Sequence, residues 1–101
     1  MDTMSEKTDR TAIATKAVRV LNKLGLHARP AAAFVKTANR FACEVFVQSG
    51  KERANGKSLL GLLVLAARQG TELTVHAHGH DARRALAELG MLFERKFGES
   101  E

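Results

Sequence analysis

Segments with the two-residue period of a β-strand alternate along this chain with segments that have helical spacing, and this order restricts the fold more than any other feature. In residues 17–24, for example, Val18, Val20 and Leu24 fall on one face, which predicts a half-buried strand. In order, we expect a strand over 17–24, a helix over 28–40, strands over 42–49 and 51–54, a helix capped by Ser58 that extends to about residue 67, a strand over 71–79, and a helix capped by Asp81 that Gly98 ends. The order βαββαβα predicts an α+β domain, in which three helices cover one face of a four-stranded antiparallel sheet and the other face stays open.

The predicted core comes from one face of each strand and of the first and last helices. Its expected members are Val18, Val20, Leu24, Ala31, Phe34, Val35, Ala38, Phe41, Cys43, Val45, Val47, Leu73, Val75, Ala77, Ala82, Ala85, Leu86, Leu89, Phe93 and Phe97. The run over 59–67 differs, because it is apolar on every side. A short helix on a small sheet can bury only one side of itself, so part of this run must stay exposed or meet a partner.

The stretch from Gly25 to Ala33 places a histidine and an arginine two residues apart, where a strand gives way to a helix. Pro30 marks the first helical turn, since its fixed φ suits a helix start and its missing N–H is not needed there. His27 therefore lies at or just before a helix N-terminus, where unpaired N–H groups bind anions, phosphate above all. Arg29 adds a guanidinium group that suits phosphate oxygens, and a neutral imidazole is a nucleophile. The local chemistry predicts a histidine that accepts a phosphoryl group.

Two motifs resemble one known family. Residues 24–32, Leu-Gly-Leu-His-Ala-Arg-Pro-Ala-Ala, resemble the active-site motif of HPr, the histidine-containing phosphocarrier protein of the bacterial phosphoenolpyruvate-dependent phosphotransferase system. Residues 55–61, Asn-Gly-Lys-Ser-Leu-Leu-Gly, resemble the regulatory-serine segment of the same family and follow the first motif at the family's spacing. The similarity runs from about residue 17 to residue 98 and implies the open-faced β-sandwich of HPr.

The resemblance also implies a mechanism and a set of site residues. Phospho-enzyme I, charged by phosphoenolpyruvate, would give its phosphoryl group to Nδ1 of His27, which would pass it to a IIA domain in sugar uptake and its regulation. Arg29 and the helix end formed by Ala28, Pro30 and Ala31 would hold the phosphoryl oxygens, and an HPr kinase/phosphorylase would phosphorylate Ser58. The implied partner-docking positions are Ala32, Ala33, Lys36, Leu59, Leu60, Leu63 and Val64. We expect a monomeric carrier with no cofactor and no substrate turnover of its own.

Two other functions stay open at this point. A regulatory paralogue such as the nitrogen-branch carrier NPr would have the same histidine chemistry but non-sugar targets. A small basic nucleic-acid binder is a different class, which the formal net charge of +5 brings into consideration. However, the five aromatic residues are all Phe, and no RNP-like aromatic pattern or KH-type loop accompanies the charge. The charge therefore favours acidic protein partners over nucleic acid.

The remaining sequence features concern location and domain limits. No apolar run approaches the length of a membrane span, and the N-terminus has no signal-peptide core. Because Cys43 is the only cysteine, an intramolecular disulfide cannot form, and we expect a reducing cytoplasm. We expect residues 1–15 to be a disordered tail, residues 16–98 to form the domain and residues 99–101 to be a C-terminal tail.

Two further motifs carry weaker signals. His76, His78 and His80 alternate, so two or three imidazoles could share one sheet face, but zinc needs three or four ligands in a tetrahedral array and we expect no metal site. The sequence Gly56-Lys57-Ser58 is similar to the end of a P-loop. The preceding glycine, Gly50, is one residue too far away for the phosphate loop, and no nucleotide-binding βαβ unit surrounds it, so we expect no nucleotide site.

Overall fold

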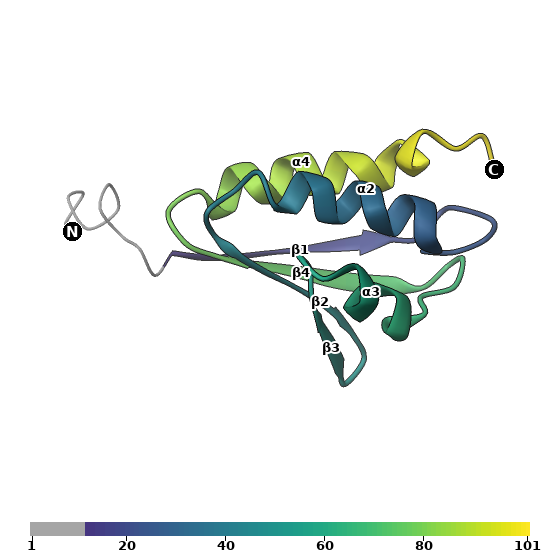
Figure 1. Ribbon diagram of the computed structural model, residues 1–101, viewed down its shortest axis with the longest axis horizontal. Helices are drawn as coiled ribbons and strands as arrows, with labels where there is room; N and C mark the ends of the chain where they lie inside the picture. Colours follow the sequence, from purple (N-terminus) through teal and green to yellow (C-terminus); the bar gives the residue numbers. More distant parts are fainter. Residues whose placement is uncertain (1–11) are drawn as a thin grey trace.

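The fold is a small antiparallel sheet with helices packed on one face. The computed structural model describes residues 12–101. Its elements are β1 (Ile13–Arg19), α2 (Ala28–Ala38), β2 (Glu44–Ser49), β3 (Glu52–Asn55), α3 (Leu59–Leu65), β4 (Glu72–His78), α4 (Ala82–Glu94) and the 3-10 helix η1 (Lys96–Gly98). The strand order is β1-β4-β2-β3, α2 and α4 run side by side over the sheet, and α3 lies next to α2 and β3 (Figure 1). The predicted α+β class, element order and open-faced architecture are confirmed.

The register of the strands explains why one sheet face is buried and the other is open. Val47 of β2 pairs with Val75 of β4, and both side chains are buried under the helices. One residue away, Phe46 pairs with His76, and both point to the opposite face and are only partly buried. The predicted core positions are buried except three: Val35 and Phe97 only pack against the edge of the core, and Leu24 is exposed. No helix within residues 12–101 is both long and apolar enough to cross a lipid bilayer.

The first strand begins and ends earlier than predicted. β1 pairs with β4 from Ile13 opposite His78 to Arg19 opposite Glu72, so β4 sets the limits of both strands. Residues 13–15, which the sequence assigned to the tail, therefore belong to the sheet, and residues 1–11 of the predicted tail lie outside the described residues. Beyond Val20 the chain turns away from the sheet, and Leu24 is 74% exposed instead of sharing the buried face. Residues 20–27 form the loop that leads to α2.

The two predicted helix caps have different outcomes. The Ser58 cap of α3 is confirmed, because its Oγ accepts a hydrogen bond from the N–H of Gly61 at 3.0 Å. Asp81 occupies the N-cap position of α4, but its side chain does not cap that helix, so the prediction is wrong in this respect. Its carboxylate accepts hydrogen bonds from the N–H groups of Ala42 at 2.8 Å and Cys43 at 2.9 Å. Asp81 therefore connects the start of α4 to the segment that precedes β2.

The second and third helices both end before their predicted limits. α3 stops at Leu65, because Ala66 adopts a left-handed conformation with φ 54°. α4 stops at Glu94 and is followed by η1, in which Lys96, Phe97 and Gly98 all have positive φ. This reversal turns the C-terminal residues back toward the loop before α2, at the same end of the molecule (Figure 1).

Candidate functional site

His27 is the N-cap residue of α2. Its backbone is extended, with φ −79° and ψ −170°, and its carbonyl accepts the first helical hydrogen bond from the N–H of Ala31 at 3.0 Å. Its imidazole makes no capping bond to the helix and is one-third exposed. The N–H groups of Ala28 and Arg29 have no partner inside the helix, and Pro30 has no N–H. Among the predicted helix-end residues, Ala31 already donates its N–H to the His27 carbonyl. Ala28 and Arg29 are therefore the backbone donors that an anion could bind.

Gly25 fixes the loop that carries His27. Its φ is +74°, and a Cβ at this position would lie 2.5 Å from the carbonyl oxygen of Ala67. That oxygen accepts a hydrogen bond from the N–H of Leu26 at 2.9 Å. Only glycine allows both the left-handed backbone and this close approach. Gly25 therefore lets the N–H of Leu26 connect the histidine loop to the segment after α3.

The imidazole of His27 is held by an acid from the other end of the chain. Its Nε2 lies 2.9 Å from Oε2 of Glu99, whose side chain is only 17% exposed. The second carboxylate oxygen of Glu99 accepts a hydrogen bond from Nδ2 of Asn22. Asn22 is 1% exposed and donates from the same nitrogen to the carbonyl of Lys96 at 2.7 Å. A buried amide thus holds both the carboxylate and the turn that carries it.

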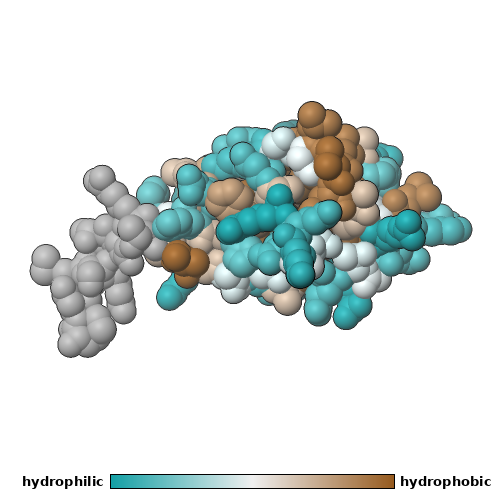
Figure 2. Space-filling view, turned by 90° about the horizontal axis from the view of Figure 1, so that it is seen from below, coloured by the Kyte–Doolittle hydropathy of each residue, from teal (hydrophilic) through white to brown (hydrophobic). Residues whose placement is uncertain are grey.

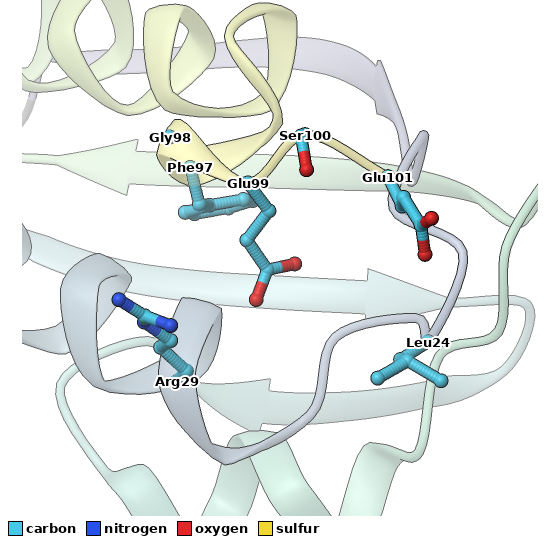
Figure 3. A pocket seen from close by; sticks show the side chains of 7 residues that line it. All are labelled: Leu24, Arg29, Phe97, Gly98, Glu99, Ser100 and Glu101. Atoms are coloured by element: carbon cyan, nitrogen blue, oxygen red, sulfur yellow. The ribbon is translucent and has the colours of Figure 1, made fainter.

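Arg29 lies in the first turn of α2 and lines a cleft with the C-terminal segment. Leu24 lies at the far side, and residues 97–101 form the other wall. In Figure 3, the Arg29 guanidinium and the Glu99 carboxylate border the same open space from opposite walls. The N-terminus of α2 therefore brings together the Arg29 guanidinium, two free backbone N–H groups and His27. This arrangement suits a phosphoryl group.

The exposed side chains of α3 form an apolar patch (Figure 2). This α3 patch consists of Leu59, Leu60, Leu63 and Val64, which are 41%, 71%, 37% and 73% exposed. The sequence alone could not separate core from surface here, and the structure buries Leu62 and Leu65 instead. A groove lined by Leu63, Arg68 and His27 joins the patch to the histidine loop.

The predicted docking positions on α2 are also accessible. Ala32 and Lys36 are exposed, and Ala33 is partly buried. α2 packs against α3, and the groove lined by Leu63 and His27 places the α3 patch beside the histidine. Ser58 adjoins this surface, because it directly precedes Leu59.

The histidines after residue 75 do not converge. Nε2 of His76 lies 3.0 Å from Oε1 of Gln48, whereas Nδ1 of His78 lies 3.9 Å from Oε1 of Glu44, and His80 is exposed in the turn before α4. Across the described ranges, no group of three or more His, Cys, Asp or Glu side chains could hold a metal ion. His76 and His78 therefore have separate partners, and His80 does not join them.

Two site residues were missed by the sequence reasoning, Asn22 and Glu99. The sequence treated residues 99–101 as a tail, because an acid after a helix-ending glycine has no distinctive local pattern. Only the reversal through η1 shows that Glu99 returns to His27. The one available signal was the position of Asn22 in a stretch predicted to be a strand, where asparagine is depleted.

Known proteins are similar to this chain in sequence. The family described as "PTS HPr component phosphorylation site" matches residues 14–95. The phosphocarrier protein HPr of Neisseria meningitidis serogroup A is 42% identical over 86 residues, which are 85% of this chain and 97% of that protein. The HPr-like protein Crh of Bacillus subtilis is 49% identical over 72 residues, which are 71% of this chain and 85% of Crh.

A solved structure agrees with the fold. The crystal structure of HPr-C-His from Thermoanaerobacter tengcongensis superposes with a TM-score of 0.84 at 39% sequence identity. The match covers 87% of this chain and 99% of that chain. The similarity therefore extends over nearly the whole of both proteins.

Proposed function

The chain belongs to the HPr family of phosphocarrier proteins of the phosphotransferase system, and from this premise we propose that it carries a phosphoryl group on Nδ1 of His27. The donor is phospho-enzyme I, charged by phosphoenolpyruvate, and the acceptor is a IIA domain. The observation that carries the proposal is the position of His27 at the N-cap of α2, in front of the free N–H groups of Ala28 and Arg29. The protein is a carrier, because the phosphoryl group is received and passed on without conversion of a substrate.

The geometry supports Nδ1 as the attacking atom. Nε2 of His27 is already engaged by Glu99 at 2.9 Å, which leaves Nδ1 as the ring nitrogen free to approach phosphorus. The Arg29 guanidinium and the α2 N-terminus hold the transferred oxygens. Charge at a helix end contributes roughly 0.3–1 kcal/mol. This modest stabilisation suits a carrier, since a tighter site would retain the phosphoryl group.

Enzyme I and the IIA domain dock on the surface around His27. The α3 patch offers apolar contact, Lys23 and Arg68 line the groove beside Leu63 with positive charge, and Lys36 is exposed on α2. Apolar contact beside basic side chains fits a partner with apolar anchors and acidic neighbours. We propose that the carrier meets both partners with the same face, as a monomer, so only one can bind at a time.

We test this face with Leu60→Glu. Leu60 is 71% exposed, so the substitution is expected to change the free energy of unfolding by less than about 0.5 kcal/mol. Loss of an apolar anchor and the added negative charge should slow phosphoryl transfer from enzyme I by about tenfold. Met91→Glu is the matched control, because Met91 is an exposed apolar residue of α4 that receives the same charge. Equal transfer rates for the two variants would contradict the docking face.

Regulation at Ser58 is a second candidate function, favoured by the similarity to Crh, which is named a catabolite repression HPr. Ser58 is partly buried, its hydroxyl caps α3, and it directly precedes the α3 patch. A phosphate there adds about −2 charge beside the apolar docking side chains and so opposes binding of an acidic partner. An HPr kinase/phosphorylase with ATP should modify the wild type and leave Ser58→Ala unmodified; modification of both at another residue would contradict this proposal.

The proposed transfer is tested by a relay assay. Phosphoenolpyruvate, enzyme I, this protein and a IIA domain are combined, and the phosphoryl group on the IIA domain is followed by intact mass. Transfer should depend on this protein and stop with His27→Ala, whose folding is checked by circular dichroism. IIA domains of the sugar and nitrogen branches, offered together, identify the branch. Transfer that continues with His27→Ala would refute the proposed role of the histidine.

A further inference from the structure

We propose that Glu99 is a positioning residue for phosphoryl transfer, whose carboxylate keeps the imidazole proton on Nε2 of His27 and so presents the Nδ1 lone pair to phosphorus. The inference rests on the proposed function of His27 and names a further residue that this function requires. It starts from the contact of 2.9 Å between Nε2 and the Glu99 carboxylate.

Glu99 is built into the site and is not a loose surface acid. Its side chain is 17% exposed, and each of its carboxylate oxygens has a separate partner, His27 on one side and Asn22 on the other. Both partners of Asn22 Nδ2, the Glu99 carboxylate and the Lys96 carbonyl, are acceptors, so the amide nitrogen must face them. Because Asn22 is 1% exposed, it has little freedom to release them. The carboxylate is therefore fixed against the imidazole by a buried donor.

The charge of Glu99 selects one tautomer of His27. An ionised carboxylate only accepts hydrogen bonds, so the ring nitrogen that faces it carries the hydrogen. The other nitrogen, Nδ1, then has the lone pair. A carboxylate that orients an imidazole in this way holds the tautomer needed for nucleophilic chemistry, as the acid of a hydrolase triad does.

The same contact explains how a carrier works in both directions without proton exchange. When the Nδ1 lone pair forms the N–P bond, the bond between phosphorus and the donor breaks and the donor keeps its electron pair. The ring then carries a positive charge, with the proton still on Nε2 and the Glu99 carboxylate beside it. When an acceptor nucleophile attacks phosphorus, the Nδ1–P bond breaks and its electron pair returns to the ring. No proton enters or leaves in either step.

The backbone conformation after α4 brings Glu99 to His27. Lys96 and Phe97 have φ of 54° and 55°, an unusual conformation for residues other than glycine. Phe97 packs edge-on against Phe93, with 4.8 Å between ring centroids, which holds the reversal in place. Backbone strain of this kind is found at functional sites when surrounding contacts enforce it. Here it places Glu99 against His27.

The experiment compares Glu99→Gln with Glu94→Gln in the full chain. Both substitutions remove one negative charge, but Glu94 is an exposed residue of α4 outside the cleft that Arg29 lines. Glutamine keeps the shape of Glu99 and can still accept a hydrogen bond, so a merely structural role would survive. The first readout is the tautomer of His27, from ¹⁵N shifts of the imidazole in the unphosphorylated protein. The second is the rate of phosphoryl acceptance from phospho-enzyme I.

We expect the wild type and Glu94→Gln to hold His27 with hydrogen on Nε2. In Glu99→Gln the amide can also donate to the ring, so the tautomer with hydrogen on Nδ1 should become several-fold more populated, and acceptance should slow by about tenfold. This loss is far smaller than that of a buried triad acid, about 10⁴-fold, because His27 is one-third exposed.

Three outcomes would overturn the inference. Identical ¹⁵N shifts and rates in the two variants would show that Glu99 does not position His27. Faster acceptance by Glu99→Gln would make Glu99 an obstructing group instead of a positioning one. If the wild type accepts no phosphoryl group, the proposed function fails, but the tautomer measurement still tests the role of Glu99. In that case, a His27 tautomer that is unchanged in Glu99→Gln rejects the inference as well.

Discussion

Asp81 gives the most quantitative prediction, because its carboxylate has two identified donors. It accepts hydrogen bonds from the N–H groups of Ala42 at 2.8 Å and Cys43 at 2.9 Å. In Asp81→Asn, only one side-chain oxygen remains, and the amide nitrogen faces an N–H donor. The variant loses one charge-assisted bond, which contributes about 1.5–3 kcal/mol in general. Since Asp81 is only half-buried, we expect a loss of about 1.5 kcal/mol at pH 7.

The pH dependence of this loss is a stricter test. Burial favours a higher pKa for Asp81, but the hydrogen bonds from Ala42 and Cys43 outweigh burial and lower the pKa below its ordinary value of 3.8. A carboxylate whose pKa is lower in the folded state stabilises the fold above its unfolded pKa, and this contribution disappears as pH falls through the folded pKa. The difference between the wild type and Asp81→Asn should therefore be constant from pH 7 to about pH 5 and shrink below about pH 4.

Urea unfolding followed by circular dichroism measures this difference, since the chain has no Trp or Tyr for fluorescence. Glu94→Gln is the control, because it removes an equal charge from an exposed position of α4 and should change stability by less than about 0.5 kcal/mol. A difference that stays the same at pH 3 and pH 7, or a variant as stable as the wild type at pH 7, would refute the reasoning.

Three further predictions concern Gly25, Ser58 and Cys43. Gly25→Ala should lower the free energy of unfolding by at least about 2 kcal/mol in urea titrations, because a left-handed alanine is strained and its Cβ meets the Ala67 oxygen at 2.5 Å; a loss below about 0.5 kcal/mol would mean that the loop can move aside. Ser58→Ala should cost about 1 kcal/mol through the lost cap on Gly61, measured in the same way, and an unchanged midpoint would count against the cap. Burial and the neighbouring carboxylate raise the pKa of the Cys43 thiol to about 11, so a thiol reagent at pH 8 should label it only in urea, and fast labelling of the native protein would contradict its burial.

The sequence predicted the fold well where periodicity and local chemistry agree. The buried faces of β2 and β4 follow directly from alternation, as Val45, Val47, Leu73 and Val75 show. The same reasoning failed for the first strand, because the partner of a strand sets its limits, and β4 is distant in sequence. Asp81 has the local signature of a helix cap, yet its carboxylate binds N–H groups 38 and 39 residues away.

The candidate site was predictable in part for the same reason. His27, Arg29 and the helix start at Pro30 lie within four consecutive residues, so local pattern and family resemblance both point to them. Glu99 lies 72 residues from His27, and no local pattern connects the two. The α3 patch is intermediate, since composition predicted that some of its apolar side chains are exposed, and only the structure shows which ones.

The most direct test of the central claim is to identify the atom that carries the phosphoryl group. The ¹⁵N-labelled protein is phosphorylated with phosphoenolpyruvate and enzyme I, kept at alkaline pH, and examined for phosphorus–nitrogen coupling at its histidines. We predict one coupled nitrogen, Nδ1 of His27, with Nε2 still protonated. Phosphorus on Nε2 of His27, on another residue, or on no residue would contradict the account.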